Sequence, residues 1–181
     1  KTRMKLTSAD VAEVIQKRLL TKNDVGVDNL SSVYHNESNN FKTLFDFADG
    51  SQTYRNFQDR DHFIHSYPFI PYQFTLFQTA ILSLSQHNAF EGKHSSVGER
   101  SMLGVFQQVA VQIGDHSIGQ LATFDLMFEG IRTALKANIQ QSILKAEKNL
   151  DDGFAIRLLK TLFLVKYVRE FKPTLRNLTV L

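Results

Sequence analysis

The chain has 181 residues, enough for one domain or two small subdomains, and 43% of them are apolar, which supports a substantial core. It contains no cysteine, which excludes disulfides and thiolate metal sites, and it has neither a membrane-length apolar run nor a secretory signal. We therefore expect a cytoplasmic protein that does not enter a membrane. The uncapped terminal phrase LTVL indicates a piece of a longer protein.

The small net charge of +3 is unevenly distributed along the chain. Residues 61–130 carry six acidic residues and only two basic ones, Lys93 and Arg100. Residues 131–181 carry ten basic residues against four acidic ones. The two isolated cations of the acidic middle lie near one loop, so they are either placed to meet an anion or are ordinary surface charges.

In the first third of the chain, cap residues and apolar spacing predict helices. A helix is expected from the cap at Thr7 to about residue 21, followed by a loop over residues 23–26. Asp28 can cap a second helix, but a polar patch leaves open whether residues 28–48 form one helix or two. Residues 52–66 are ambiguous between a short helix and extended chain.

The central stretch, residues 63–113, has the clearest signals. Tyr67 and Ile70 each precede a proline, which disfavours helical angles and predicts an extended segment leading into a helix that begins at Pro71. Ser96 and Glu99 have the spacing of a capping box that opens a second helix, with Gly114 at its end.

After Gly114 the apolar residues step by three or four from Leu121 to Leu150, which predicts one helix of about 30 residues. A last helix follows Asp152 and ends before Pro173. No alternating run of β-branched residues occurs, so the predicted class is all-α. We expect a multi-helix array with a lid-like helical subdomain at 1–116 and a long antiparallel helix pair with a truncated C-terminal element at 117–181.

The sequence lacks the motifs of nucleotide hydrolysis. A P-loop requires Gly, four residues and then Gly-Lys-Ser/Thr, but Gly92-Lys93 is followed by His94, and His87 stands where the first glycine belongs. No apolar strand ending in acidic residues offers a Walker B motif. These residues alone are therefore not expected to hydrolyse ATP or to contain catalytic residues.

The segment Ser96-Val97-Gly98-Glu99-Arg100-Ser101 has three interpretations. It is a capped helix start with an ordinary arginine, or the start of an AAA-type lid helix whose arginine senses the γ-phosphate of a nucleotide held elsewhere. The third is the Ser-Gly-Gly-Glu/Gln-Arg signature of transporters and chromosome clamps, from which Val97 departs. On the second interpretation the nucleotide-sensing candidates are Lys93, Ser96, Gly98 and Arg100, near a helix N-terminus that attracts phosphate.

The basic exterior of the last two predicted helices can follow a phosphate backbone, although solvated helix faces have the same composition. The candidates for nucleic-acid contact are Lys145, Lys148, Arg157, Lys160, Lys166 and Arg169. His62 and His65 form an H-x-x-H pair, but no acidic residue or third histidine lies at a suitable spacing. A solvated or core-edge pair is expected there and no metal site is predicted.

Three phrases carry a resemblance to a known family: YPFIPYQF at 67–74, GKHSSVGERSML at 92–103 and FLVKYV at 163–168. They resemble the large P-loop ATPase of bacteriophage-exclusion (BREX) systems, the BrxC/PglY family. The similarity runs along most of the chain, strongest at 63–108 and weakest at 23–60. Members are much longer than this chain and carry their nucleotide-binding core upstream.

The resemblance implies a helical region that follows the ATPase core of a phage-defence protein. It implies that the parent protein binds ATP and Mg²⁺ and forms a homo-oligomer with other phage-defence proteins, acting on phage DNA, whereas this piece binds no cofactor alone. The alternative hypothesis is a non-catalytic helical interaction module that binds DNA or a partner protein through its basic C-terminal helices.

Overall fold

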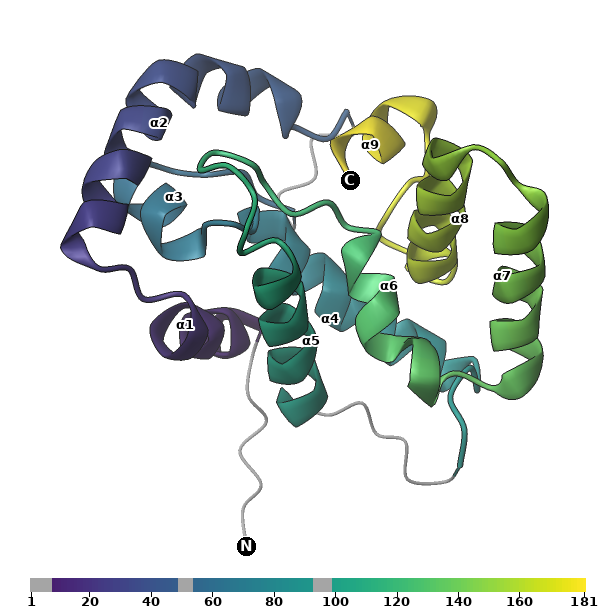
Figure 1. Ribbon diagram of the computed structural model, residues 1–181. Helices are drawn as coiled ribbons and strands as arrows, with labels where there is room; N and C mark the ends of the chain where they lie inside the picture. The colour runs from purple at the N-terminus through teal and green to yellow at the C-terminus, as the bar shows by residue number, and fades with distance from the viewer. Residues whose placement is uncertain (1–7, 49–53, 93–98) are drawn as a thin grey trace, which may run out of the picture. The chain divides into compact units, whose positions relative to one another are not determined.

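A computed structural model describes residues 8–48, 54–92 and 99–181 (Figure 1). In these ranges the chain forms α-helices and one 3-10 helix and no β-strand, apart from an isolated bridge between Phe90 and Leu135. The predicted all-α class is confirmed. No helix within the described ranges is both long enough and apolar enough to cross a membrane.

The chain divides into two compact units that interleave along the sequence. Unit 1 comprises residues 1–76, 110–122 and 180, and unit 2 comprises residues 77–109, 123–179 and 181. The division predicted from the sequence, at residue 116, cuts the chain only once. The two units are grouped by contacts in space, whereas the predicted boundary at residue 116 follows chain order, so that boundary stays a prediction.

Unit 1 begins with α1 (Ser8–Leu19), α2 (Asp24–Leu44) and α3 (Arg60–Ser66). Side-chain caps start α2 and α3: Asn23 Oδ1 accepts from the Gly26 N–H at 2.8 Å, and Asp59 Oδ1 accepts from the His62 N–H at 2.7 Å. The predicted loop at 23–26 and the cap at Asp28 are therefore wrong, because Asn23 caps the helix earlier. Residues 28–44 belong to a single helix.

Aromatic rings fill the core of unit 1 between α2 and α3. The Phe63 ring lies 5.2 Å from Phe41, 5.1 Å from Phe57 and 5.5 Å from Tyr34, measured between ring centroids. Phe63 is fully buried, and Leu30 is nearly so. Because aromatic side chains bury large apolar areas, this cluster stabilises the packing of α2 against α3.

Helix α4 (Pro71–Gln86) begins at the predicted proline. The predicted extended segment before it is wrong, because residues 67–69 form a turn in which the Phe69 N–H donates to the Ser66 carbonyl at 2.9 Å. The start of α4 is fixed by Gln73, which is fully buried. Gln73 Oε1 accepts from the N–H of Ile70 at 3.1 Å, which is the side-chain half of a capping box, and Nε2 donates to the carbonyl of Ala122 at 2.7 Å. The first turn of α4 is thereby bound to the segment that follows α5 (Glu99–Gln112).

Unit 2 contains the C-terminal part of α4, most of α5, and the later helices α6 (Leu126–Ile131), η1 (Arg132–Ala134), α7 (Ala137–Asn149), α8 (Gly153–Val165) and α9 (Leu175–Val180). Phe77 of α4 meets Phe106 of α5 edge-on, with ring centroids 5.8 Å apart, and also meets Phe124 at 6.4 Å. All three rings are fully buried. They form the core against which α4 and α5 pack.

The predicted helix of about 30 residues over 121–150 is wrong. The chain there forms α6, η1 and α7, with Leu135 in extended conformation. Leu135 pairs with Phe90 in an antiparallel bridge, and the next N–H, that of Lys136, donates to the carbonyl of Ala89 at 2.9 Å. This tertiary pairing takes the place of helical hydrogen bonds, so local periodicity was misleading.

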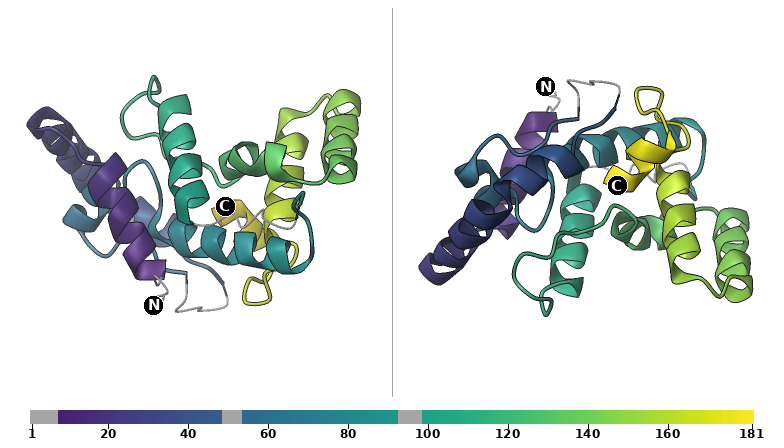
Figure 2. Two further views of the ribbon diagram at one scale, coloured as in Figure 1. Left: turned by 90° about the horizontal axis from the view of Figure 1, so that it is seen from below. Right: turned by 90° about the horizontal axis from the view of Figure 1, so that it is seen from above.

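The predicted long antiparallel helix pair is accordingly not present. Instead, α7 and α8 are two 13-residue helices that contact each other across a short connection (Figure 2). Asp152 caps α8 as predicted, its Oδ1 accepting from the Phe154 N–H at 2.8 Å. The helix ends at Val165, well before Pro173, and turns carry the buried Val168 and Phe171.

Candidate functional site

The nucleotide-sensing candidates lie around the start of α5. Lys93, Ser96 and Gly98 lie outside the described residues. Arg100 stands in the first turn of α5, a helix of 14 residues, where the backbone is described and the side chain is not. The predicted cap at Ser96 lies outside the described residues, and α5 is described from Glu99. The N-terminal N–H groups of a helix attract phosphate.

The part of α5 up to residue 109 belongs to unit 2. Met102, Phe106 and Val109 occupy one face and are buried, whereas Gly104 is exposed. The spacing of three and four residues confirms the predicted apolar face. A helix anchored along one face presents its first turn in a fixed direction, so the position of the Arg100 backbone follows from the packing behind it.

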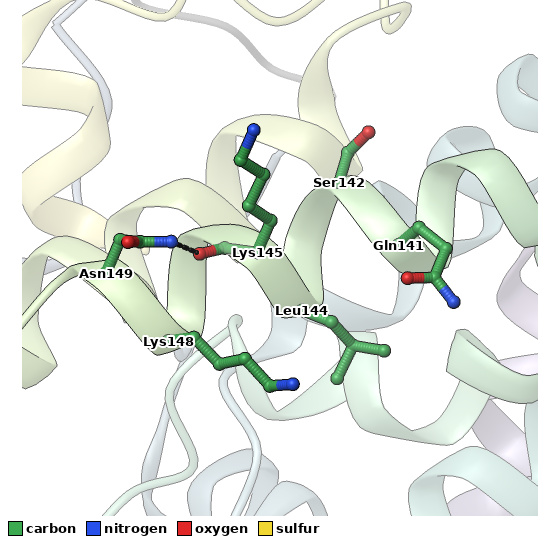
Figure 3. Close-up of a pocket in the computed structure, with 6 residues that line it drawn as sticks. All are labelled: Gln141, Ser142, Leu144, Lys145, Lys148 and Asn149. Atoms are coloured by element: carbon green, nitrogen blue, oxygen red, sulfur yellow. Dashed lines mark hydrogen bonds between the residues drawn. The ribbon is translucent and has the colours of Figure 1, made fainter.

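The exposed surface of α7 carries two of the nucleic-acid candidates (Figure 3). A shallow cavity of about 530 Å³ is lined by Gln141, Ser142, Leu144, Lys145, Lys148 and Asn149. Figure 3 shows the Lys145 and Lys148 side chains extending in different directions from the helix. None of these six lining residues is acidic, so the surface presents two exposed ammonium groups and several amide and hydroxyl groups, which suits phosphate contact.

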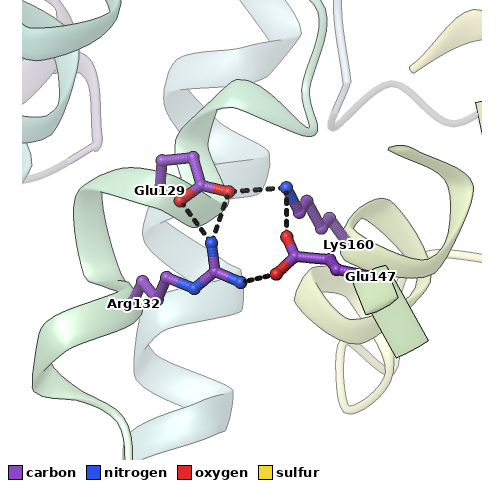
Figure 4. Close-up of polar contacts among 4 residues, drawn as sticks. All are labelled: Glu129, Arg132, Glu147 and Lys160. Carbon is purple, nitrogen blue, oxygen red and sulfur yellow. Dashed lines mark hydrogen bonds and ion pairs between the residues drawn. The ribbon is translucent and has the colours of Figure 1, made fainter. Parts of the chain in front are cut away.

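Lys160 is placed very differently, in a cluster of four charges that we call the ion cluster: Glu129, Arg132, Glu147 and Lys160 (Figure 4). Lys160 Nζ lies 2.6 Å from Glu129 Oε1 and 2.9 Å from Glu147 Oε1. Arg132 pairs with the same two carboxylates: its Nη1 lies 3.0 Å from Glu129 Oε2, and its Nη2 contacts Glu147 Oε2. The cluster joins α6, η1, α7 and α8.

The side chains of the ion cluster are 14–28% exposed, so their charges are only partly screened by solvent. Burial alone would raise the pKa of the Glu147 carboxyl, but hydrogen bonds from Lys160 and Arg132 outweigh it and lower that pKa. Burial alone would lower the pKa of Lys160, but the hydrogen bonds and charges of Glu129 and Glu147 outweigh it and raise that pKa. A nucleic-acid phosphate would have to displace both carboxylates to reach this ammonium.

The remaining nucleic-acid candidates are exposed. Arg157 lies over the Phe154 ring, 6.0 Å from its centroid, and Lys166 lies over Tyr167 at 5.0 Å. Arg169 is exposed as well. Together with Lys145 and Lys148, these residues leave a basic exterior on unit 2 that does not depend on Lys160.

Two features of the surface were not predicted from the sequence. Arg157 and Phe154 line an apolar groove of about 430 Å³ that α9 completes with the exposed Leu175. In unit 1, a cavity of about 420 Å³ is lined by Lys22, His62 and their neighbours. In residues 8–48, 54–92 and 99–181 no three His, Cys, Asp or Glu side chains are grouped so as to hold a metal ion.

No protein-family model matches this chain, and no solved structure matches it. The assignment of a function therefore depends on the residues and geometry described above, together with the resemblance of its three sequence phrases.

Proposed function

We propose that this chain is a helical lid or regulatory region of a large bacterial phage-defence ATPase of the BREX type. The resemblance of residues 67–74, 92–103 and 163–168 supports the proposal. The observation that carries it is the place of Arg100 in the first turn of α5, a helix in which Met102, Phe106 and Val109 are buried. In this proposal the longer protein binds ATP and Mg²⁺ on its upstream core, and this region responds to the bound nucleotide.

Physical chemistry explains why an arginine suits this task. A guanidinium is always charged and can donate two parallel hydrogen bonds to phosphate oxygens, and the N-terminal end of a helix adds a favourable dipole. Arg100 therefore acts as a sensing residue that stabilises charge on the γ-phosphate. The protein works in the cytoplasm as a homo-oligomer with other phage-defence proteins.

The aromatic contacts of α5 suggest how nucleotide binding is passed on. Phe106 contacts Phe77 of α4, and Phe77 contacts Phe124, which precedes α6. Because close-packed rings resist independent movement, a shift of α5 displaces its neighbours in unit 2. Nucleotide bound near Arg100 is thereby coupled to the helices that carry the basic exterior.

The test is ATP hydrolysis by the longer protein with Arg100→Ala, Arg100→Lys and, as a control, Arg169→Ala on the exposed surface. Losing a γ-phosphate contact lowers the rate by about tenfold or more, and lysine restores only part of it because it lacks the planar donor pair. Arg169→Ala leaves the rate unchanged. Hydrolysis by Arg100→Ala at the wild-type rate would refute the sensing proposal.

A second candidate function is supported by the exposed lysines of α7. In this alternative the chain is a non-catalytic module that binds DNA or an acidic partner through Lys145, Lys148, Arg157, Lys166 and Arg169. Binding of double-stranded DNA by the 181-residue chain is measured across a salt series for wild type, Lys145→Glu/Lys148→Glu and the control Lys42→Glu. The double variant lowers the salt slope by about 2 if both lysines contact phosphates; no binding at low salt would contradict this candidate.

A further inference from the structure

A cavity of about 420 Å³ in unit 1 carries a cluster of basic side chains. It lies among the end of α1, the connection to α2, and α3. Its lining residues are Gln16, Lys17, Leu20, Thr21, Lys22, Val27, His62, Ile64 and His65. Four of these nine are lysine or histidine and none is acidic, so the cavity is a basic site built from three separate segments.

Lys22 is the central group of this cavity. Its Nζ donates to the backbone carbonyl of Tyr67 at 2.6 Å, and its side chain is half-buried. An ammonium has three donors. The carbonyl is neutral, so it supplies one acceptor but no counter-charge. Burial without a counter-charge lowers the pKa of Lys22 to about 8.

The two histidines add donors to the same cavity. His62 Nδ1 accepts from the Gln58 N–H at 3.3 Å, which leaves Nε2 as the N–H donor of the neutral ring. Burial lowers the pKa of His62, the charge of Asp59 partly offsets this, and His65 adds to it. His65 itself is exposed at the edge of the site.

Two acidic residues near the cavity have hydrogen-bond or ion-pair partners of their own, although the charge of Asp59 still acts on His62. Asp59 accepts from the backbone N–H of His62 as the cap of α3, and Glu13 forms an exposed ion pair with Lys17. Neither of them lines the cavity. Within the described part of unit 1, Lys22 Nζ therefore donates to a neutral carbonyl, and two imidazoles line the same cavity.

We propose that this cavity binds the phosphate group of a small phosphorylated molecule through Lys22, His62 and His65. A phosphate supplies both the missing counter-charge and the missing acceptors, and it accepts from the ammonium and from imidazole N–H groups at once. The cavity has the volume of an ordinary small-molecule site, which is larger than a lone phosphate needs. The site lies in unit 1 and is independent of the proposed response of Arg100 to nucleotide.

The proposal differs from a purely structural assignment of Lys22. Lys22 binds the carbonyl at the C-cap of α3, a position where a cation is favourable in its own right. If that were its whole purpose, phosphate would leave Lys22 unaffected. If phosphate binds, the added counter-charge raises the pKa of Lys22 above its ligand-free value of about 8, and affinity falls as the pH rises from that value towards the raised one.

The experiment uses the 181-residue chain and two probes, inorganic phosphate and methyl phosphate, at constant ionic strength. Calorimetric titration gives the affinity, and NMR of the Lys22 ε-methylene gives the pKa of that amine with and without each probe. The variants are Lys22→Met, His65→Gln and the control Lys42→Met, an exposed lysine on α2 that does not line the cavity.

We expect phosphate to raise the pKa of Lys22, and Lys22→Met to weaken binding by about tenfold or more, as for loss of a hydrogen bond to a charged group. His65→Gln weakens binding less, and Lys42→Met leaves it unchanged. Tighter binding of methyl phosphate than of inorganic phosphate identifies the ligand as an ester, and the reverse order as free phosphate.

Equal binding by wild type and Lys22→Met would overturn the proposal, as would an unchanged pKa of Lys22 in the presence of both probes. If Lys22→Met does not fold, the wild-type titration of Lys22 and the His65→Gln variant decide by themselves. If Lys22→Met is less stable to heat and phosphate has no effect on the wild type, Lys22 serves only the C-cap of α3. That result also overturns the proposal.

Discussion

Four charged side chains of unit 2 share their partners, so removal of one changes the environment of the other three. Lys160→Met leaves Glu129 and Glu147 charged with only Arg132 between them. We expect a loss of about 1–2 kcal/mol in the free energy of unfolding at neutral pH, less than for a fully buried pair because solvent still reaches the cluster. Urea denaturation measures it, with the exposed Lys145→Met as the control.

The pH dependence of this loss has a definite sign. The pKa of Glu147 is lowered in the folded chain, so its contribution is complete above its unfolded value of about 4.5 and is lost as the pH falls through the lower folded value. Lys160→Met removes one of the two cations that lower the pKa of Glu147. The difference between wild type and variant should therefore shrink in acid, and a difference that grows below pH 4.5 would contradict the proposed charge balance.

Gln73 is a second residue whose partners lie far away in sequence. Gln73→Leu leaves the Ile70 N–H and the Ala122 carbonyl without this partner inside unit 1. Two buried groups without a partner cost about 2–4 kcal/mol in the free energy of unfolding. Gln86→Leu, at the exposed end of the same helix, is the matched control and should change stability by about 0.5 kcal/mol or less.

Interactions between neighbouring residues could be predicted from the sequence, whereas those between residues far apart in the chain could not. The cap at Asp152 and the helix start at Pro71 were predictable, because each depends on neighbouring residues. The bonds of Gln73 to Ala122 and of Lys22 to Tyr67 span 49 and 45 residues, and no local pattern indicates them.

At the scale of helices, two glycines in helical conformation make a matched pair. A Cβ at Gly130 of α6 would lie 2.7 Å from both methyl carbons of the buried Val105, whereas a Cβ at Gly104 of α5 meets no described atom within 4 Å. Helix propensity alone favours alanine at both positions by about 1 kcal/mol. Overpacking against a β-branched buried side chain costs about 1–3 kcal/mol, so it reverses the sign at Gly130.

We therefore expect Gly104→Ala to raise the melting temperature and Gly130→Ala to lower it. Val105→Ala removes the clash, so Gly130→Ala should be tolerated better in that background than in wild type. Thermal denaturation of wild type, Gly130→Ala, Val105→Ala and the double variant completes a double-mutant cycle and gives the coupling between the two sites. An additive cycle would show that α5 and α6 do not pack as described.

The helices themselves were largely predictable where apolar residues recur at helical spacing, as in α1, α4, α5 and α8. The exception is instructive. Apolar residues continue at helical spacing through Leu135, yet Leu135 is extended and pairs with Phe90. Periodicity records which residues are buried, and a buried bridge satisfies the same pattern as a buried helix face.

At the scale of the whole molecule, the sequence predicted the all-α class but not the interleaved units. Each unit is assembled from segments far apart in the chain, so a boundary sought along the sequence does not find them. The same limit applies to the basic exterior. Composition assigned Lys145 and Lys160 to one surface, but only the fold shows that Lys145 is exposed while Lys160 is bound by two carboxylates.

The proposed response to nucleotide can be measured directly at α5. In the longer protein, amide hydrogen exchange of residues 99–105 is compared with and without a non-hydrolysable ATP analogue and Mg²⁺, with α2 of unit 1 as the internal reference. The proposal predicts slower exchange in the first turns of α5 on nucleotide binding, and no such slowing in an Arg100→Ala variant that still binds nucleotide. Identical exchange of these amides with and without bound nucleotide would contradict it.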